Sequence, residues 1–113
     1  MAQAAPQIFD VAALRKEVAG PEPRYYEFLA GRGLTGGVYR LPAGSHDLQT
    51  PHLEDEVYVV LDGKACLRMG DTERDIEPGQ VLFIPANTRH AFVKITADLT
   101  LLAVFSASPT PLP

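Results

Sequence analysis

Residues 44–63 read GSHDLQTPHLEDEVYVVLDG and indicate the fold more strongly than any other stretch of the chain. They contain two of the three histidines, and Glu56 opens the apolar run that follows. Imidazole and carboxylate groups are common ligands of divalent metal ions. In a straight strand, His52 and Glu56 would lie roughly 13 Å apart at about 3.3 Å per residue, too far to share an ion. A shared ion therefore requires the chain to reverse direction at residues 53–55. Pro51 keeps the chain extended just before this reversal.

A second stretch, residues 77–92, reads EPGQVLFIPANTRHAF. Pro78 and Gly79 predict one turn and residues 85–87 predict another, with a strand between them. His90 opens the next apolar run, as Glu56 does in the first stretch.

Together the two stretches resemble the two motifs of the cupin superfamily, over roughly residues 44–94. The matching positions in this chain are Gly44, His52, Glu56 and Gly63 in the first motif and Gly79, Pro85 and His90 in the second. Thr50 stands where the first motif has another histidine, and Asn87 and Lys94 replace a glycine and an asparagine of the second. The resemblance implies an all-β fold, the double-stranded jelly-roll β-barrel, with a metal site inside its mouth.

The remaining chain predicts short elements separated by turns. Asp10 is a plausible N-cap for a short helix over Val11–Ala19. The predicted strands are Arg24–Leu29, Leu34–Leu41, Glu56–Leu61, Lys64–Met69, Thr72–Glu77, Gln80–Ile84, Ala91–Ile95 and Leu99–Phe105. A tight hairpin turn is expected at Asp62-Gly63. The last two predicted strands are expected to be joined across Ala97-Asp98. We predict a lead with a short helix (1–23), a barrel domain (24–105) and a proline-rich tail (106–113).

Composition excludes several classes of protein. The chain has 113 residues, a formal charge of −4 and no cluster of Lys and Arg, so nucleic acid and anionic membranes are not expected partners. Its apolar runs are too short to span a bilayer, and its start does not read as a signal peptide. The single cysteine, Cys66, cannot form an internal disulfide, which favours a cytoplasmic location.

The resemblance makes His52, Glu56 and His90 the expected ligands of a divalent transition metal: Fe, Mn, Zn or Ni. This set leaves coordination positions open for water or substrate. Gln49 is a candidate fourth ligand through its amide oxygen, and His46 is a further candidate. Thr50 could instead hold a metal-bound water. The alternative is a cupin that keeps the fold without the ion.

The sequence also predicts roles for residues near these candidate ligands. Tyr58 lies two residues beyond Glu56 on the same strand face, either as a proton donor in the pocket or as a packed aromatic. Glu54 and Asp55 are expected to form a solvated turn, and Arg89 a surface charge. The pocket walls are expected to come from the predicted strands at 57–61, 81–84 and 91–95, around a small organic acid or a phenol-like molecule.

Two functions compete. One is a metal-dependent enzyme of the dioxygenase, isomerase or lyase type, acting on a small metabolite; the other is a non-catalytic binding or sensing module. The fold alone does not select between them. Because small barrels leave strand edges to cover, a homodimer is expected, with Arg24–Leu29 at the interface.

Overall fold

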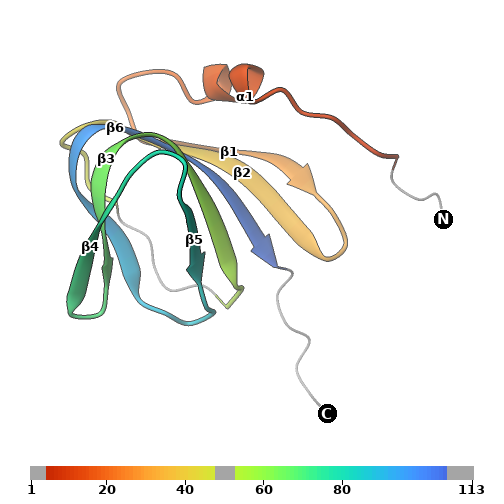
Figure 1. Cartoon of the computed structure of the whole chain (residues 1–113). Helices are drawn as coiled ribbons and strands as arrows, with labels where there is room; N and C mark the ends of the chain where they lie inside the picture. Colours follow the sequence, from red (N-terminus) through yellow and green to blue (C-terminus); the bar gives the residue numbers. More distant parts are fainter. Residues whose placement is uncertain (1–4, 48–52, 107–113) are drawn as a thin grey trace, which may run out of the picture.

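The computed structural model describes residues 5–47 and 53–106 of the chain. Its elements are α1 (Val11–Glu17), β1 (Arg24–Ala30), β2 (Leu34–Leu41), β3 (Glu56–Met69), β4 (Thr72–Ile76), β5 (Val81–Ile84) and β6 (His90–Ser106). The strands form one antiparallel sheet in the order β1-β2-β6-β3-β4, and β5 pairs with β3. The sheet curls strongly, and α1 lies outside the curl beside β1 and β2 (Figure 1). No helix in the described part is long and apolar enough to cross a membrane.

Helix α1 begins where the sequence predicts. The Asp10 side chain accepts a hydrogen bond from the Ala12 amide at 3.0 Å, which confirms the N-cap. The helix ends at Glu17, two residues earlier than predicted, because Val18 leaves helical geometry at φ −114° and ψ 10°. Leu14 and Val18 are buried against Val38 of β2, so the helix covers the outer face of the sheet.

The hairpin turn predicted at Asp62-Gly63 and the connection between strands predicted at Ala97-Asp98 are both wrong. Both pairs lie inside long strands, β3 and β6, which pair with each other from Glu56–Phe105 to Met69–His90 with register shifts near Asp62 and Lys64. Gly63 has a φ of 109°, and a Cβ added there would lie 2.4 Å from the Asp98 carbonyl oxygen. The glycine serves a bulge where the two strands approach closely, not a hairpin.

The other strand predictions hold. The predicted strand Leu34–Leu41 has the bounds of β2, and β1 is one residue longer than predicted. The turn at Gly70 joins β3 to β4. The inner face of the curled sheet carries the larger core, built from Leu41, Tyr58, Val60, Ala65, Leu67, Ile76, Ile84, Phe92, Ile95, Leu99, Leu101 and Ala103. One end of this face is polar, and the candidate site lies there.

Candidate functional site

Three side chains predicted for the site meet inside the curl. Glu56 and Tyr58 point to the same face of β3, and His90 begins β6. The Tyr58 hydroxyl donates a hydrogen bond to Glu56 Oε2 at 2.7 Å. His90 Nε2 lies 3.1 Å from the same oxygen and 3.5 Å from the Tyr58 hydroxyl. Glu56 and Tyr58 are each only 1% exposed and His90 5%, so this cluster is buried in the fold.

The His90 ring has a defined orientation. Its Nδ1 lies 2.9 Å from the Thr88 carbonyl oxygen, and since a carbonyl only accepts, Nδ1 carries the hydrogen and donates it. In the neutral ring, Nε2 then presents its lone pair to Glu56 Oε2. Two acceptors at this separation repel each other unless a proton or a cation lies between them. A backbone carbonyl behind the ring is also how metal-bound histidines are commonly held.

The neighbours of His90 act on its pKa in opposite directions. Burial alone would lower the pKa, because it disfavours the charged ring. The hydrogen bonds to Glu56 and to the Thr88 carbonyl, with the charges of Glu56 and Asp47, outweigh burial and raise the pKa above its usual value. The raised pKa means that the surroundings of His90 favour a positive charge at the ring, which a proton or a metal ion can supply.

Glu56 and His90 suit a divalent metal in chemistry and spacing. Two ligands with metal bonds of about 2.1 Å lie roughly 3 Å apart when they occupy adjacent positions around one ion, close to the separation seen here. Within residues 5–47 and 53–106, no three His, Cys, Asp or Glu side chains gather as a metal site, and the exposed His46 does not complete one. His52, Gln49 and Thr50 lie outside the described residues.

Two aspartates that flank the site have structural roles the sequence did not reveal. Asp47 accepts a hydrogen bond from the Tyr39 hydroxyl at 2.9 Å and another from the Phe92 amide at 2.8 Å. Asp55 accepts the Ala86 amide at 2.8 Å, and its own amide donates to the Ser106 hydroxyl at 3.0 Å. These bonds hold the chain entering the candidate site to β2 and β6 and to the turn before His90.

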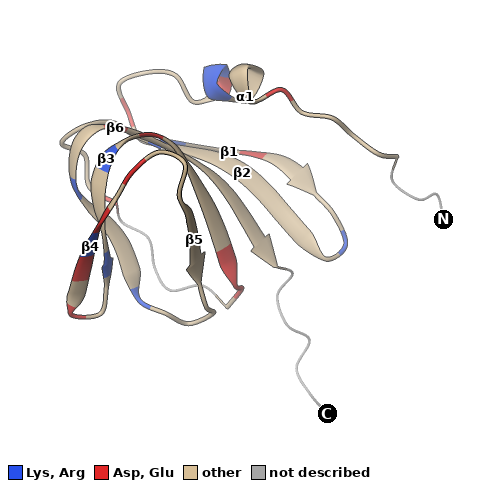
Figure 2. Ribbon diagram, viewed as in Figure 1, with Lys and Arg blue, Asp and Glu red and all other residues tan. Residues whose placement is uncertain are grey.

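Asp55 is exposed, as expected of a solvated turn, but its hydrogen bonds also hold this turn to two other segments. Asp55 joins the two motif regions, and the half-buried Glu54 lines a cavity. The start of β3 and the turn before it form a short acidic segment (Figure 2). A turn held by such bonds and a free turn look alike in sequence, because the Ala86 amide and the Ser106 hydroxyl lie 31 and 51 residues from Asp55 along the chain.

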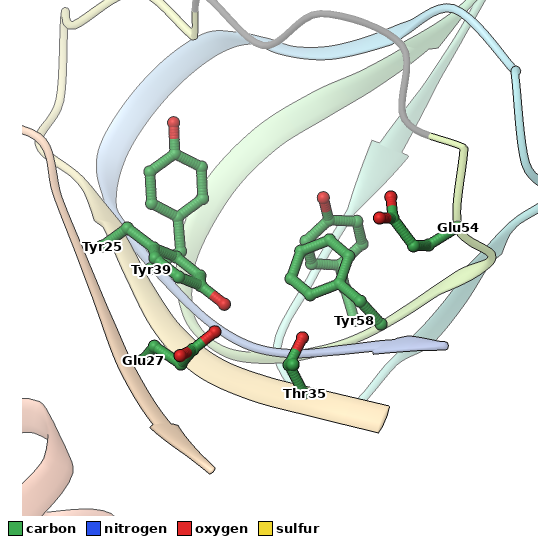
Figure 3. A pocket seen from close by; sticks show the side chains of 7 residues that line it. Tyr25, Glu27, Thr35, Tyr39, Glu54 and Tyr58 are labelled. Carbon is green, nitrogen blue, oxygen red and sulfur yellow. The ribbon is translucent and has the colours of Figure 1, made fainter. Parts of the chain in front are cut away.

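An open cavity of about 380 Å³ adjoins the buried cluster. Its described lining is aromatic and acidic: Tyr25, Glu27, Thr35, Tyr39, Glu54, Tyr58 and Phe105 (Figure 3). Tyr58 belongs to both sites, since its ring lines the cavity and its hydroxyl bonds to Glu56. Tyr58 therefore connects a molecule in the cavity to Glu56.

The strand register explains why the sheet is hollow here. Across the inner face, Glu27 lies opposite Gly37, Gly37 opposite Ala103, and Ala103 opposite Tyr58. Side chains paired in this way point to the same face of an antiparallel sheet. The two middle positions are small, so the row leaves a space between its ends, and the Tyr25 ring lies across Gly37. A Cβ on Gly37 would lie 2.1 Å from the Tyr25 hydroxyl oxygen.

The cavity walls differ from those predicted. Of the three strand segments expected to form them, only the segment at 57–61 contributes, through Tyr58. The other described walls come from β1, β2, the turn before β3 and the end of β6. The edge strand β1, assigned to a dimer interface in the sequence analysis, supplies Tyr25 and Glu27 to the cavity.

Comparison with known proteins agrees with this architecture. The family model described as Cupin domain matches residues 37–105. An uncharacterized protein of Streptomyces coelicolor is 39% identical over 98 residues, which cover 87% of this chain and 93% of that protein.

Two solved structures are similar in fold. A cupin family protein of Methanocaldococcus jannaschii with a double-stranded β-helix fold has a TM-score of 0.70 and 15% identity, covering 77% of this chain and 82% of that one. The DMSP lyase DddQ of Ruegeria pomeroyi has a TM-score of 0.71 and 22% identity over 80% of this chain. This chain spans about half of that lyase, 50% of its length.

Proposed function

Because this chain belongs to the Cupin domain family and has its double-stranded β-helix fold, we propose that it is a metal-dependent enzyme acting on a small organic molecule. One observation carries the proposal. The buried His90 ring is oriented by the Thr88 carbonyl so that its Nε2 lone pair meets Glu56 Oε2, and Glu56 is hydrogen bonded to Tyr58, which lines a cavity. Buried acceptors placed this close favour a cation between them.

In this proposal Glu56 and His90 hold a divalent ion of Fe, Mn, Zn or Ni together with His52, and Gln49 is the candidate for a fourth ligand. When bound, the ion supplies Lewis-acid chemistry to an oxygen of the substrate. Three or four protein ligands leave coordination positions open, as catalytic sites require.

Tyr58 is the proposed proton donor. Its hydroxyl hydrogen bonds to Glu56, and its ring lines the cavity, so it connects the buried carboxylate to a bound molecule. A phenol so placed can donate a proton to a substrate oxygen or carbon. These groups suit an isomerase, a lyase or, with iron, a dioxygenase.

We further propose that the protein is cytoplasmic and homodimeric.

Metal analysis of protein purified without added metal tests the site. We expect near-stoichiometric transition metal in the parent protein, and its loss in Glu56→Gln and His90→Asn. Glu22→Gln is the matched control, because it removes a carboxylate from an exposed position outside the candidate site. Retention of full metal by both site variants would show that the ligands are wrong.

A turnover assay then separates an enzyme from a binding module. Tyr58→Phe should keep the metal and lose turnover, because the ring remains and only the donor is removed. A parent protein that binds metal and small molecules but converts none of a broad panel of metabolites is a binding module, which would refute the catalytic part of the proposal.

A further inference from the structure

The cavity beside Tyr58 has walls made largely of aromatic rings. Tyr25 and Tyr39 meet edge to face with centroids 5.9 Å apart, and Phe105 lies 6.3 Å from both Tyr25 and Tyr58. Aromatic faces carry partial negative charge and attract cations, most strongly where water is displaced. Burial, followed by the charges of Glu27 and Glu56, raises the pKa of Tyr25 to about 12, so this ring remains a neutral phenol at ordinary pH.

The charged groups of the same cavity have one sign. Glu27 of β1 and Glu54 before β3 both line it, and the described lining contains no Lys or Arg. Figure 3 shows their carboxylates on opposite sides of the cavity, with tyrosine rings between them. An anionic ligand would face both carboxylates, whereas a positive ligand gains from them and from the rings.

We propose that this cavity binds a small organic cation of the methylated ammonium type, with its positive group among the tyrosine rings between Glu27 and Glu54. The volume of about 380 Å³ lies at the small end of ligand pockets, which run from about 300 to 1,000 Å³, and fits a small metabolite and not a polymer. The inference rests on the proposed function only in taking this cavity as the substrate site. It replaces the organic acid expected from the sequence with a ligand of opposite charge.

Calorimetric titration of the full-length protein with choline chloride tests the charge requirement. The neutral comparison is 3,3-dimethylbutan-1-ol, which has the shape of choline without its charge, and the anionic comparison is benzoate. We expect choline to bind at least about tenfold more tightly than the neutral alcohol, and benzoate more weakly than either. Equal affinities for choline and the alcohol, no detectable choline binding, or tightest binding of benzoate would each overturn the proposal.

Two substitutions then locate the charge. Glu54→Gln should weaken choline binding about fivefold, and Glu27→Gln about threefold because Glu27 is more exposed and therefore more screened. Neither should change binding of the neutral alcohol. Glu22→Gln is the matched control, since it removes the same charge from an exposed position outside the cavity lining. If Glu22→Gln weakens choline binding as much as Glu54→Gln, the cation is attracted by net charge and the site assignment is wrong.

The tyrosine walls have their own test. Tyr25→Phe should retain most of the choline affinity, because the aromatic face remains, whereas Tyr25→Leu should lose several-fold. Equal losses in both variants would show that the hydroxyl, not the ring face, holds the ligand.

Metal content is measured on the same preparations. Bound metal with no choline binding overturns this inference and leaves the metal site standing. Choline binding without metal overturns the proposed metal-dependent function and supports the ligand class.

Discussion

Replacing Tyr58 with phenylalanine removes one oxygen atom from the buried cluster and leaves the ring in place. The lost hydroxyl donates to Glu56 Oε2 at 2.7 Å, and both side chains are 1% exposed, so water cannot take its place. A hydrogen bond to a charged acceptor contributes about 1.5–3 kcal/mol. The ring contacts with Phe92 and Phe105, at 5.2 and 6.3 Å between centroids, do not involve the hydroxyl.

We therefore expect Tyr58→Phe to lower the free energy of unfolding by about 2 kcal/mol, or roughly 8 °C in Tm at about 4 °C per kcal/mol for a domain of this size. The measurement is urea unfolding of protein treated with a chelator, so that metal does not contribute, with an unchanged m-value as the sign of two-state behaviour.

Tyr25→Phe is the matched control. Its side chain is 42% exposed, so water can replace any bond that its hydroxyl loses, and we expect a change within about 0.5 kcal/mol. If the two substitutions cost the same, or if Tyr58→Phe costs less than about 0.5 kcal/mol, the hydroxyl of Tyr58 does not stabilise a buried carboxylate and the reasoning fails.

Three further outcomes follow from other parts of the fold. Gly63→Ala should destabilise the protein by at least about 2 kcal/mol in the same unfolding assay. The reason is that φ of Gly63 is positive and the new Cβ would meet the Asp98 carbonyl. An unchanged midpoint of urea unfolding would show that the bulge does not require glycine. The pKa of the Cys66 thiol is raised by its hydrogen bond to Asp75, then by burial and by the Asp75 charge. Asp75→Asn should therefore lower this pKa and speed alkylation of Cys66 by iodoacetamide at pH 8. Slower alkylation would contradict the expected direction of the pKa change. Light scattering should show that the parent protein is a dimer and that Tyr26→Glu is a monomer. The reason is that β1 is an edge strand of the sheet and Tyr26 on it is exposed. A monomeric parent protein would refute the dimer proposal.

The sequence predicts most short elements because their signals are local. Leu34–Leu41 lies between a glycine pair and a proline turn, and its bounds are confirmed. Asp62-Gly63 gives the same local signal for a hairpin and for a bulge, since both need a glycine with positive φ. The close approach of β6 to β3, a contact between distant segments, selects the bulge.

The candidate site likewise has a part that the sequence predicts and a part that it does not. Motif spacing singles out Glu56 and His90, and strand alternation places Tyr58 beside Glu56, so these three could be predicted from sequence to lie together. The cavity could not, because it depends on register between strands far apart in the chain: Thr35 pairs with Phe105, and Gly37 with Ala103. Nothing near Gly37 in sequence indicates that the absence of a side chain there leaves room for the Tyr25 ring, which lines the cavity.

The long pairing of β3 with β6 also has a consequence for how the chain folds. Met69 pairs with His90, whereas Glu56 pairs with Phe105, more than twice as far away along the chain. Closing a longer loop costs more entropy, so pairing is expected to begin at the Met69 end and to reach Glu56 last. Interactions made only after the transition state act on the unfolding rate. Glu56 and Tyr58 would then govern how long the folded barrel lasts, while the Met69–His90 end of the pairing sets how fast it forms.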